Sequence, residues 1–367
     1  LELSGSHVPV AGEAFEIIKP ESISPSFTGT FSGLGGGSTF EHNGSLLQIA
    51  YGQTYQGDGP NVVLTTLLGP NRATWTGAVD SDWYNPDNWD AGTLPTALDD
   101  VWIKSGTNPA VLPSGEVTVS SLLLLSSGNL TIDEGATLTL GGGTAGLVAH
   151  NGSLAINGDL IVQGNTKGNQ TIGFNITIGE TGFLSFLGAS NDVVLEKKLT
   201  CNGQLILDGG AGLVIEDNGN LTVSATGVAS ITGTTGTGIF LDDASTTIAG
   251  QLTITESTED GLYAQETSNV IVSGTGTLMV TNSGGDGVYL DGNNTDVLTN
   301  NGVLVITGSD DEALAGGGIV DNRGGSTFRG SGIIGNDIEL YSAAHATLEQ
   351  EWRLCAWSCN PIASSSQ

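Results

Sequence analysis

The chain has 367 residues, among them 57 Gly, 10 Pro and a single Met, and its 39 acidic residues outnumber the 9 basic ones to give a formal net charge of −30. Such a charge balance leaves no basic patch to neutralise phosphates, which excludes nucleic acids and anionic membrane surfaces as partners. The glycines follow no Gly-X-Y period, so collagen is excluded, and the abundant Thr, Val, Ile, Asn and Ser indicate many short strands joined by tight turns.

No apolar run approaches the roughly 20 residues that a membrane-spanning helix requires, so we expect no membrane span in this chain. The sequence begins at Leu1, which does not look like a translation start, and it carries no signal peptide. We therefore expect a processed chain or a fragment of a longer protein.

Residues 1–70 are Gly-rich and strand-like, which predicts a small N-terminal β module. Its aromatic residues are expected to form its core: Phe15, Phe27, Phe31, Phe40 and Tyr51. Residues 71–104 hold four of the six Trp and are interpreted as a junction or cap: Trp75, Trp83, Trp89 and Trp102.

Residues 105–340 consist of short runs that alternate apolar and polar residues and are bounded by Gly or Asn. Within them a period of 26 places Leu252, Leu278 and Leu304 in equivalent positions. A unit of this size cannot bury its apolar side alone, whereas stacked copies can. The sequence therefore predicts an all-β parallel β-helix of about nine to eleven coils, if each coil uses about 20–26 residues.

The same period aligns Asp260, Asp286 and Glu312 along the predicted rod. Carboxylates stacked at the strand spacing of about 4.8 Å repel one another. Two alternatives follow: the side chains splay into water, or they bind a calcium ion together with nearby carbonyl oxygens. We expect no other cofactor.

Residues 341–367 change in character and are expected to form a C-terminal cap or tail. They contain Trp352 and Trp357, and Cys355 and Cys359 lie four residues apart. An extracellular disulfide between these cysteines is expected only if the segment is not helical. Aromatic residues near both ends of a rod indicate end caps or end-to-end contacts.

Two stretches resemble a known family. The run from Phe27 to Leu34, followed by Leu47–Tyr51 and Gly57–Thr65, resembles the end of a unit in large bacterial surface proteins. These proteins carry autotransporter-associated β-strand repeats and β-helices like those of filamentous haemagglutinin. The segment from Trp75 to Val101, with its Asn85-Pro86 and Asn88-Trp89 pairs, resembles the start of the next unit. The resemblance implies a right-handed parallel β-helix, secretion, and a surface or adhesive role without catalysis.

Catalysis is not expected. A β-helical polysaccharide lyase needs a basic residue beside its carboxylates, and residues 240–320 contain neither Lys nor Arg. Asn294, Asp296, Asp310 and Asp311 match only parts of the polygalacturonase pattern, which requires paired carboxylates. The four His are scattered and none lies beside a candidate nucleophile.

The sequence thus favours an extracellular or cell-surface structural protein that forms a filament, sheath or adhesive fibre. Its main expected partner is itself, in a head-to-tail homopolymer. The expected contact residues are Phe27, Phe31 and Tyr51 at one end and Trp352 and Trp357 at the other. The alternatives are an adhesin fragment that binds surface glycans or cells and, third, a polysaccharide lyase or hydrolase.

Overall fold

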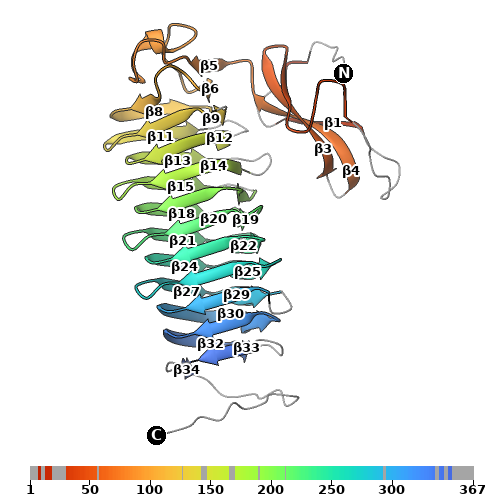
Figure 1. Ribbon diagram of the computed structural model, residues 1–367, viewed down its shortest axis with the longest axis vertical. Coiled ribbons are helices and arrows are strands. Elements are labelled where there is room, and N and C mark those ends of the chain that lie inside the picture. The colour runs from red at the N-terminus through yellow and green to blue at the C-terminus, as the bar shows by residue number, and fades with distance from the viewer. Residues whose placement is uncertain are drawn as a thin grey trace.

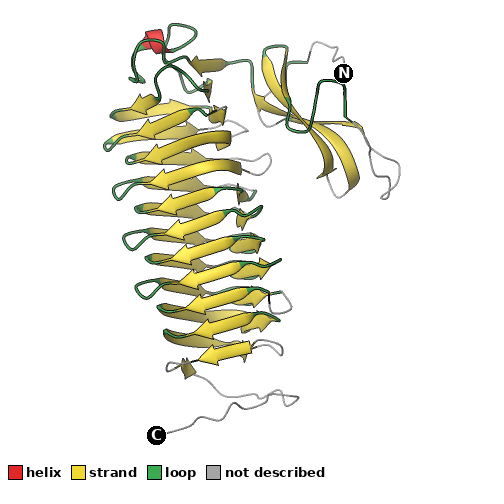
Figure 2. Cartoon of the chain, in the orientation of Figure 1, coloured by secondary structure: helices red, strands yellow, loops and turns green. Residues whose placement is uncertain are grey.

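The structure is a computed structural model, and it describes most of the chain between residues 7 and 348. The described residues are 7–9, 13–18, 30–55, 58–125, 127–141, 147–164, 170–188, 191–210, 212–291, 295–334, 339–342 and 346–348. Within these ranges the protein is all-β, and its one helix is the short 3₁₀ turn η1 (Pro86–Asn88). Figure 2 shows strands stacked into a long rod with a smaller sheet beside one end.

The N-terminal module is a four-stranded antiparallel sheet in the order β1-β4-β3-β2. Its strands are β1 (Ala14–Ile18), β2 (Thr39–His42), β3 (Ser45–Tyr55) and β4 (Asp58–Leu68). The core on one side of the sheet contains Leu47, Ile49, Val62 and Leu64. The module is therefore a folded unit with a core of its own.

The rod is a parallel β-helix in which each coil contributes to three stacked faces. The first face contains β8 (Gly115–Val119), β11 (Ala136–Gly141), β13 (Asp159–Gln163), β15 (Phe183–Leu187), β18 (Gln204–Asp208), β21 (Val228–Thr232), β24 (Gln251–Thr255), β27 (Thr277–Thr281), β30 (Val303–Gly316), β32 (Gly325–Ile334) and β34 (Ala346–Leu348).

The second face contains β7 (Ala110–Leu112), β10 (Asn129–Ile132), β12 (Leu147–Ile156), β14 (Gln170–Ile178), β17 (Lys198–Cys201), β20 (Asn220–Val223), β23 (Ser245–Ile248), β26 (Asn269–Val272), β29 (Val297–Asn300), β31 (Ile319–Asn322) and β33 (Glu339–Ser342). The third face contains β5 (Arg72–Trp75), β6 (Asp100–Ile103), β9 (Ser121–Leu125), β16 (Val193–Leu195), β19 (Leu213–Ile215), β22 (Ile239–Asp242), β25 (Leu262–Gln265) and β28 (Val288–Leu290), together with parts of β12, β14 and β30.

The interior of the rod is a continuous apolar core made by alternate residues of each strand. Leu252 pairs with Leu278, and Leu278 pairs with Leu304, in adjacent parallel strands. All three leucines are fully buried. The predicted 26-residue coil is therefore confirmed. The described chain forms about nine turns between residues 100 and 322, which agrees with the expected number.

Corners between faces use residues in the left-handed backbone region. After the strands of the first face, this position is taken by Gly233 (φ 66°), Glu256 (φ 59°), Asn282 (φ 59°) and Gly308 (φ 74°). Only glycine adopts this conformation at little cost, so the two non-glycine corners must be held by the hydrogen bonds of neighbouring coils. The amide of Glu256 bonds to the carbonyl of Thr281, and that of Asn282 to the carbonyl of Thr307.

The two ends of the rod differ. At the N-terminal end a loop after β5 folds over the first coil, whereas the C-terminal end finishes with β33 and β34 (Figure 1). Among the described residues, no strand pairs with the far edge of either strand. Backbone groups on such an edge invite another strand.

Candidate functional site: acidic and aromatic rows on the third face

The acidic row predicted from the period, Asp260, Asp286 and Glu312, lies at the corner before the third face. Asp260 Oδ1 accepts the amide of Asp286 at 2.7 Å, and Asp286 Oδ1 accepts the amide of Glu312 at 2.8 Å. The carboxylates of Asp260 and Asp286 therefore each bind the backbone of the next coil. These two hydrogen bonds partly satisfy the stacked carboxylates of Asp260 and Asp286 within the protein.

Burial and mutual repulsion affect the protonation of this acidic row. The pKa of Asp286 is raised to about 7, first because burial disfavours the charge and then because Asp260 and Glu312 repel it. The amide of Glu312 donates to the charged form and opposes this shift. Burial also raises the pKa of Asp260. Part of the row is thus poised to carry protons near neutral pH.

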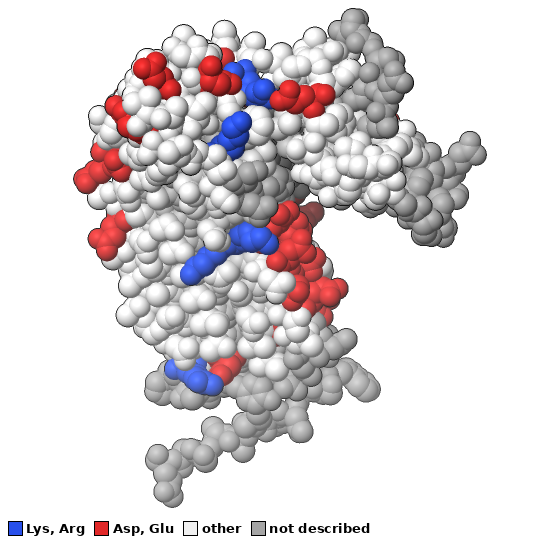
Figure 3. Space-filling view, turned by 45° about the horizontal axis from the view of Figure 1, so that its top comes forward, with Lys and Arg blue, Asp and Glu red and all other residues white. Residues whose placement is uncertain are grey.

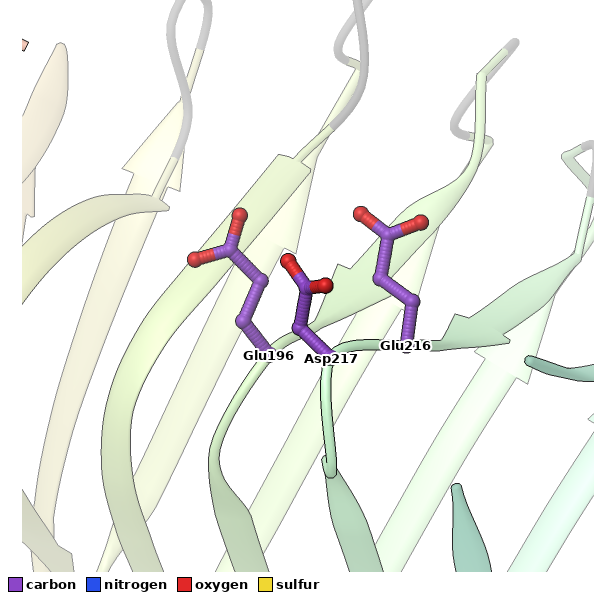
Figure 4. A group of neighbouring side chains, drawn as sticks. All are labelled: Glu196, Glu216 and Asp217. Carbon is purple, nitrogen blue, oxygen red and sulfur yellow. The ribbon is translucent and has the colours of Figure 1, made fainter. Parts of the chain in front are cut away.

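The calcium prediction for this row remains a prediction. Within the described residues, the group of three carboxylates close enough to share a metal ion lies elsewhere, at Glu196, Glu216 and Asp217. Their ligand oxygens lie within 4.8 Å of one another. Figure 4 shows the three side chains projecting side by side from neighbouring coils. Asp217 occupies a left-handed corner (φ 52°).

Burial and neighbouring charges both disfavour the charged form of Glu216 in this second acidic group. The pKa of Glu216 is raised, first by burial and then by the nearby charges of Asp217, Glu196 and Asp242. Figure 3 shows acidic side chains gathered along one edge of the rod below the N-terminal module. Sequence reasoning missed this group because the coils before residue 240 vary in length, so no fixed period aligns its members.

Between the two acidic groups runs a row of aromatic rings on the outer side of the third face. Phe240 pairs with Tyr263, and Tyr263 pairs with Tyr289, in successive strands. The rings are stacked with centroids 5.2 Å and 5.0 Å apart. All three side chains are partly exposed. The signal was present in the sequence, since Tyr263 and Tyr289 are 26 residues apart, but it was not assigned a role.

The tyrosines of this row interact with the acids beside them. The pKa of Tyr263 is raised to about 12 by burial, by the charge of Asp291 and by a hydrogen bond to Asp291. Burial and the charges of Asp291, Asp286 and Asp260 raise the pKa of Tyr289. Both phenols therefore remain neutral hydrogen-bond donors at physiological pH.

Three of the four tryptophans of residues 71–104 pack together at the N-terminal end of the rod. Trp75, Trp83 and Trp89 are almost completely buried and pack edge to face, with centroids 5.1 Å and 4.8 Å apart. The indole of Trp89 donates to the carbonyl of Trp83, and that of Trp75 to the carbonyl of Asn108. These three side chains are therefore buried within their own chain.

Trp102 has a different place, at the junction with the N-terminal module. Leu46 and Leu67 of the module are buried against Leu123 of the rod, with Trp102 and Leu125 packed beside them. The junction is also polar, because the buried carboxylate of Asp100 accepts the amide of Gly69 and the hydroxyl of Ser121, each at 2.6 Å. Arg72 forms an ion pair of 2.9 Å with Glu41. The module therefore rests on the side of its own rod.

Two of the predicted contact residues serve the module itself. The Tyr51 hydroxyl donates to the carbonyl of Leu34 and accepts the amide of Phe31, each at 2.8 Å. Both aromatic rings pack against the core of the module. The remaining predicted positions lie outside the described residues: Phe27, Trp352, Trp357, Cys355 and Cys359.

A model of a domain of unknown function, DUF8693, matches residues 74–180. The matched segment starts in β5 and so contains the tryptophan cap and the first coils. No curated protein and no solved structure matches the chain. In the part of the chain that the structure describes, no helix is long and apolar enough to cross a bilayer.

Proposed function

We propose that the protein is an extracellular or cell-surface structural protein whose rods join head to tail into a filament, sheath or adhesive fibre. The observation that carries the proposal is the difference between the two ends of the rod. The N-terminal end is closed by Trp75, Trp83 and Trp89, while at the other end no strand among the described residues pairs with the outer edge of β33 or β34. Such an edge is a template for a strand from another molecule.

The N-terminal module supplies a matching edge. In the sheet order β1-β4-β3-β2, strand β1 pairs only with β4 among the described strands. Because the module lies beside the closed end of the rod, the β1 edge of one copy can meet the open edge of the next (Figure 1). A contact between two different surfaces does not close on itself, so it propagates into a fibre.

The charge of −30 opposes this assembly at long range. Counterions limit the effect, because the Debye length is about 8 Å at physiological ionic strength. An end-to-end contact also brings together only the ends of two long rods. We therefore expect elongation to require salt, and divalent cations such as calcium to promote it.

Electron microscopy and sedimentation of the purified chain test the proposal. We expect rods that elongate with concentration, and lateral clusters or monomers would contradict the head-to-tail arrangement. Deletion of residues 1–70, combined with Leu123→Thr to replace the leucine that the module covers, should leave folded rods that do not elongate. The same result is expected for Trp352→Ser with Trp357→Ser.

A matched control is Leu123→Thr in the full chain, which keeps β1 and should still elongate. If the intact chain remains a monomer at high concentration with and without calcium, the filament proposal fails. An adhesin fragment that binds glycans would then be the better interpretation.

We also propose that the protein is not an enzyme, and turnover of an acidic polysaccharide that disappears on Asp310→Ala or Asp311→Ala would overturn this.

A further inference from the structure

The aromatic row of the third face is bordered by carboxylates on both sides. Before it lie Asp260 and Asp286, whose charges act on Tyr263 and Tyr289. After it lie Asp242, the last residue of β22, and Asp291, which directly follows β28, while Gln265 occupies the equivalent position in the coil between them. Side chains two residues apart in a strand point to the same side. A partly apolar stripe therefore runs along the rod between two acidic stripes.

The ring faces in this stripe are largely used within the protein. Phe240, Tyr263 and Tyr289 stack on one another with interplanar angles of 20° and 15°. A sugar or a bare cation that prefers an aromatic face would therefore find the inner faces covered. What the stripe offers to a partner is ring edges between carboxyl groups on both sides, of which Asp286 is partly protonated near neutral pH because its pKa is raised to about 7.

Lys and Arg side chains match such a surface, because they bury an aliphatic stem on apolar groups while the charged head reaches a polar neighbour. Asp286 lies at the corner before β28 and Asp291 directly after it, so carboxyl groups flank Tyr289 on both sides along the chain. An extended segment presents alternate side chains to opposite sides, so its basic residues can reach both acidic stripes.

We propose that this stripe binds an extended Lys- and Arg-rich segment of a partner protein. Charge complementarity supports the choice of partner, since residues 240–320 contain no basic residue that could pair with these acids. A second copy of the chain is a poor occupant because it has only 9 basic residues. The surrounding negative field would speed association and make it depend on salt.

Fluorescence anisotropy with a labelled peptide of alternating Arg and Ser tests the proposal on the full chain. We expect saturable binding that weakens as salt is raised, and no binding of the same peptide with Glu in place of Arg. The double variant Asp242→Asn with Asp291→Asn should weaken binding about tenfold, which corresponds to about 1.4 kcal/mol.

The matched control is Glu116→Gln with Glu134→Gln, which removes the same charge from exposed positions near the first coils. This control should change the dissociation constant by less than about twofold, because screening limits charges far from the site. Equal weakening by both double variants would show attraction by net charge alone and overturn the proposal.

The aromatic stripe is tested separately. Tyr263→Phe keeps the ring and frees the Asp291 carboxylate from its hydrogen bond with Tyr263, so it should bind the peptide at least as well as the unchanged chain. Tyr263→Ser should weaken binding severalfold while circular dichroism shows an intact fold, and unchanged binding would contradict a role for the ring edges. Spermine and Ca²⁺ are tested in the same way. If either binds with the same dependence on Asp242 and Asp291 while the peptide does not bind, the ligand of the stripe is a free cation and the proposed protein partner is wrong.

Discussion

The two acidic groups of the rod have opposite relations to the fold. In the regular coils, Asp260 and Asp286 each accept a backbone amide of the next coil. At Glu196, Glu216 and Asp217 the carboxylates mainly face one another. Similar residue types in neighbouring coils thus stabilise the stack in one place and strain it in another. The difference lies in whether a backbone donor meets the carboxylate.

The largest expected effect comes from removing the acceptor in the regular row. Asp286→Ala leaves the amide of Glu312 without its partner, which should lower the free energy of unfolding by about 1–3 kcal/mol. Asp286→Asn keeps an acceptor oxygen, so it should lose no more than about 0.5 kcal/mol of this free energy. Chemical denaturation measures both. Equal losses in the two variants would show that the charge matters and the hydrogen bond does not.

An intermediate effect is expected from pH. The pKa of Asp286 is raised to about 7 in the folded protein, compared with about 3.9 in an unfolded chain. The folded state therefore holds a proton that the unfolded state releases. This contribution to stability is complete below about pH 4 and is lost as the pH rises through about 7. Urea midpoints should fall between pH 5 and pH 8, and less steeply in Asp286→Asn. A midpoint that rises over this range would contradict the assignment.

The smallest effect is expected at the second acidic group. Glu216→Gln removes one of several repelling charges without removing a backbone partner. We expect a gain of about 0.5 kcal/mol at low ionic strength, because exposed charges interact weakly. The gain should vanish near 1 M salt, where the Debye length is about 3 Å. A loss of stability at low salt would show that this carboxylate supports the fold as Asp286 does.

The period of 26 was sufficient to predict the stacked leucines and the alignment of the acidic residues. Interior positions must repeat with the coil, so the equivalence of Leu252, Leu278 and Leu304 can be recognised from the sequence alone. The hydrogen-bond partners of the aligned carboxylates could not be predicted from the sequence. The sequence offered water or calcium for Asp286, and it did not indicate that this carboxylate accepts an amide of the next coil.

Features that depend on irregular segments escaped sequence reasoning. Glu196 and Glu216 lie close together in coils of uneven length, so no fixed sequence spacing predicts their proximity. The N-terminal module was predicted as a unit, but its contact with the rod through Leu46 and Leu67 was not. Nothing in the local pattern of those strands distinguishes a leucine that faces the module's own core from one that faces the rod.

What the sequence by itself determined is the β-helix: alternation selects the inner side of each strand, and the repeat selects its neighbour in the next coil. These properties are local or periodic. Only the tertiary structure decided which side chains serve the fold and which remain available to a partner. Trp75, Trp83 and Trp89 became a buried cap, while Phe240 and Tyr263 formed a partly exposed row. Burial and hydrogen bonding depend on what another coil or the module places opposite a residue, and that information is not local.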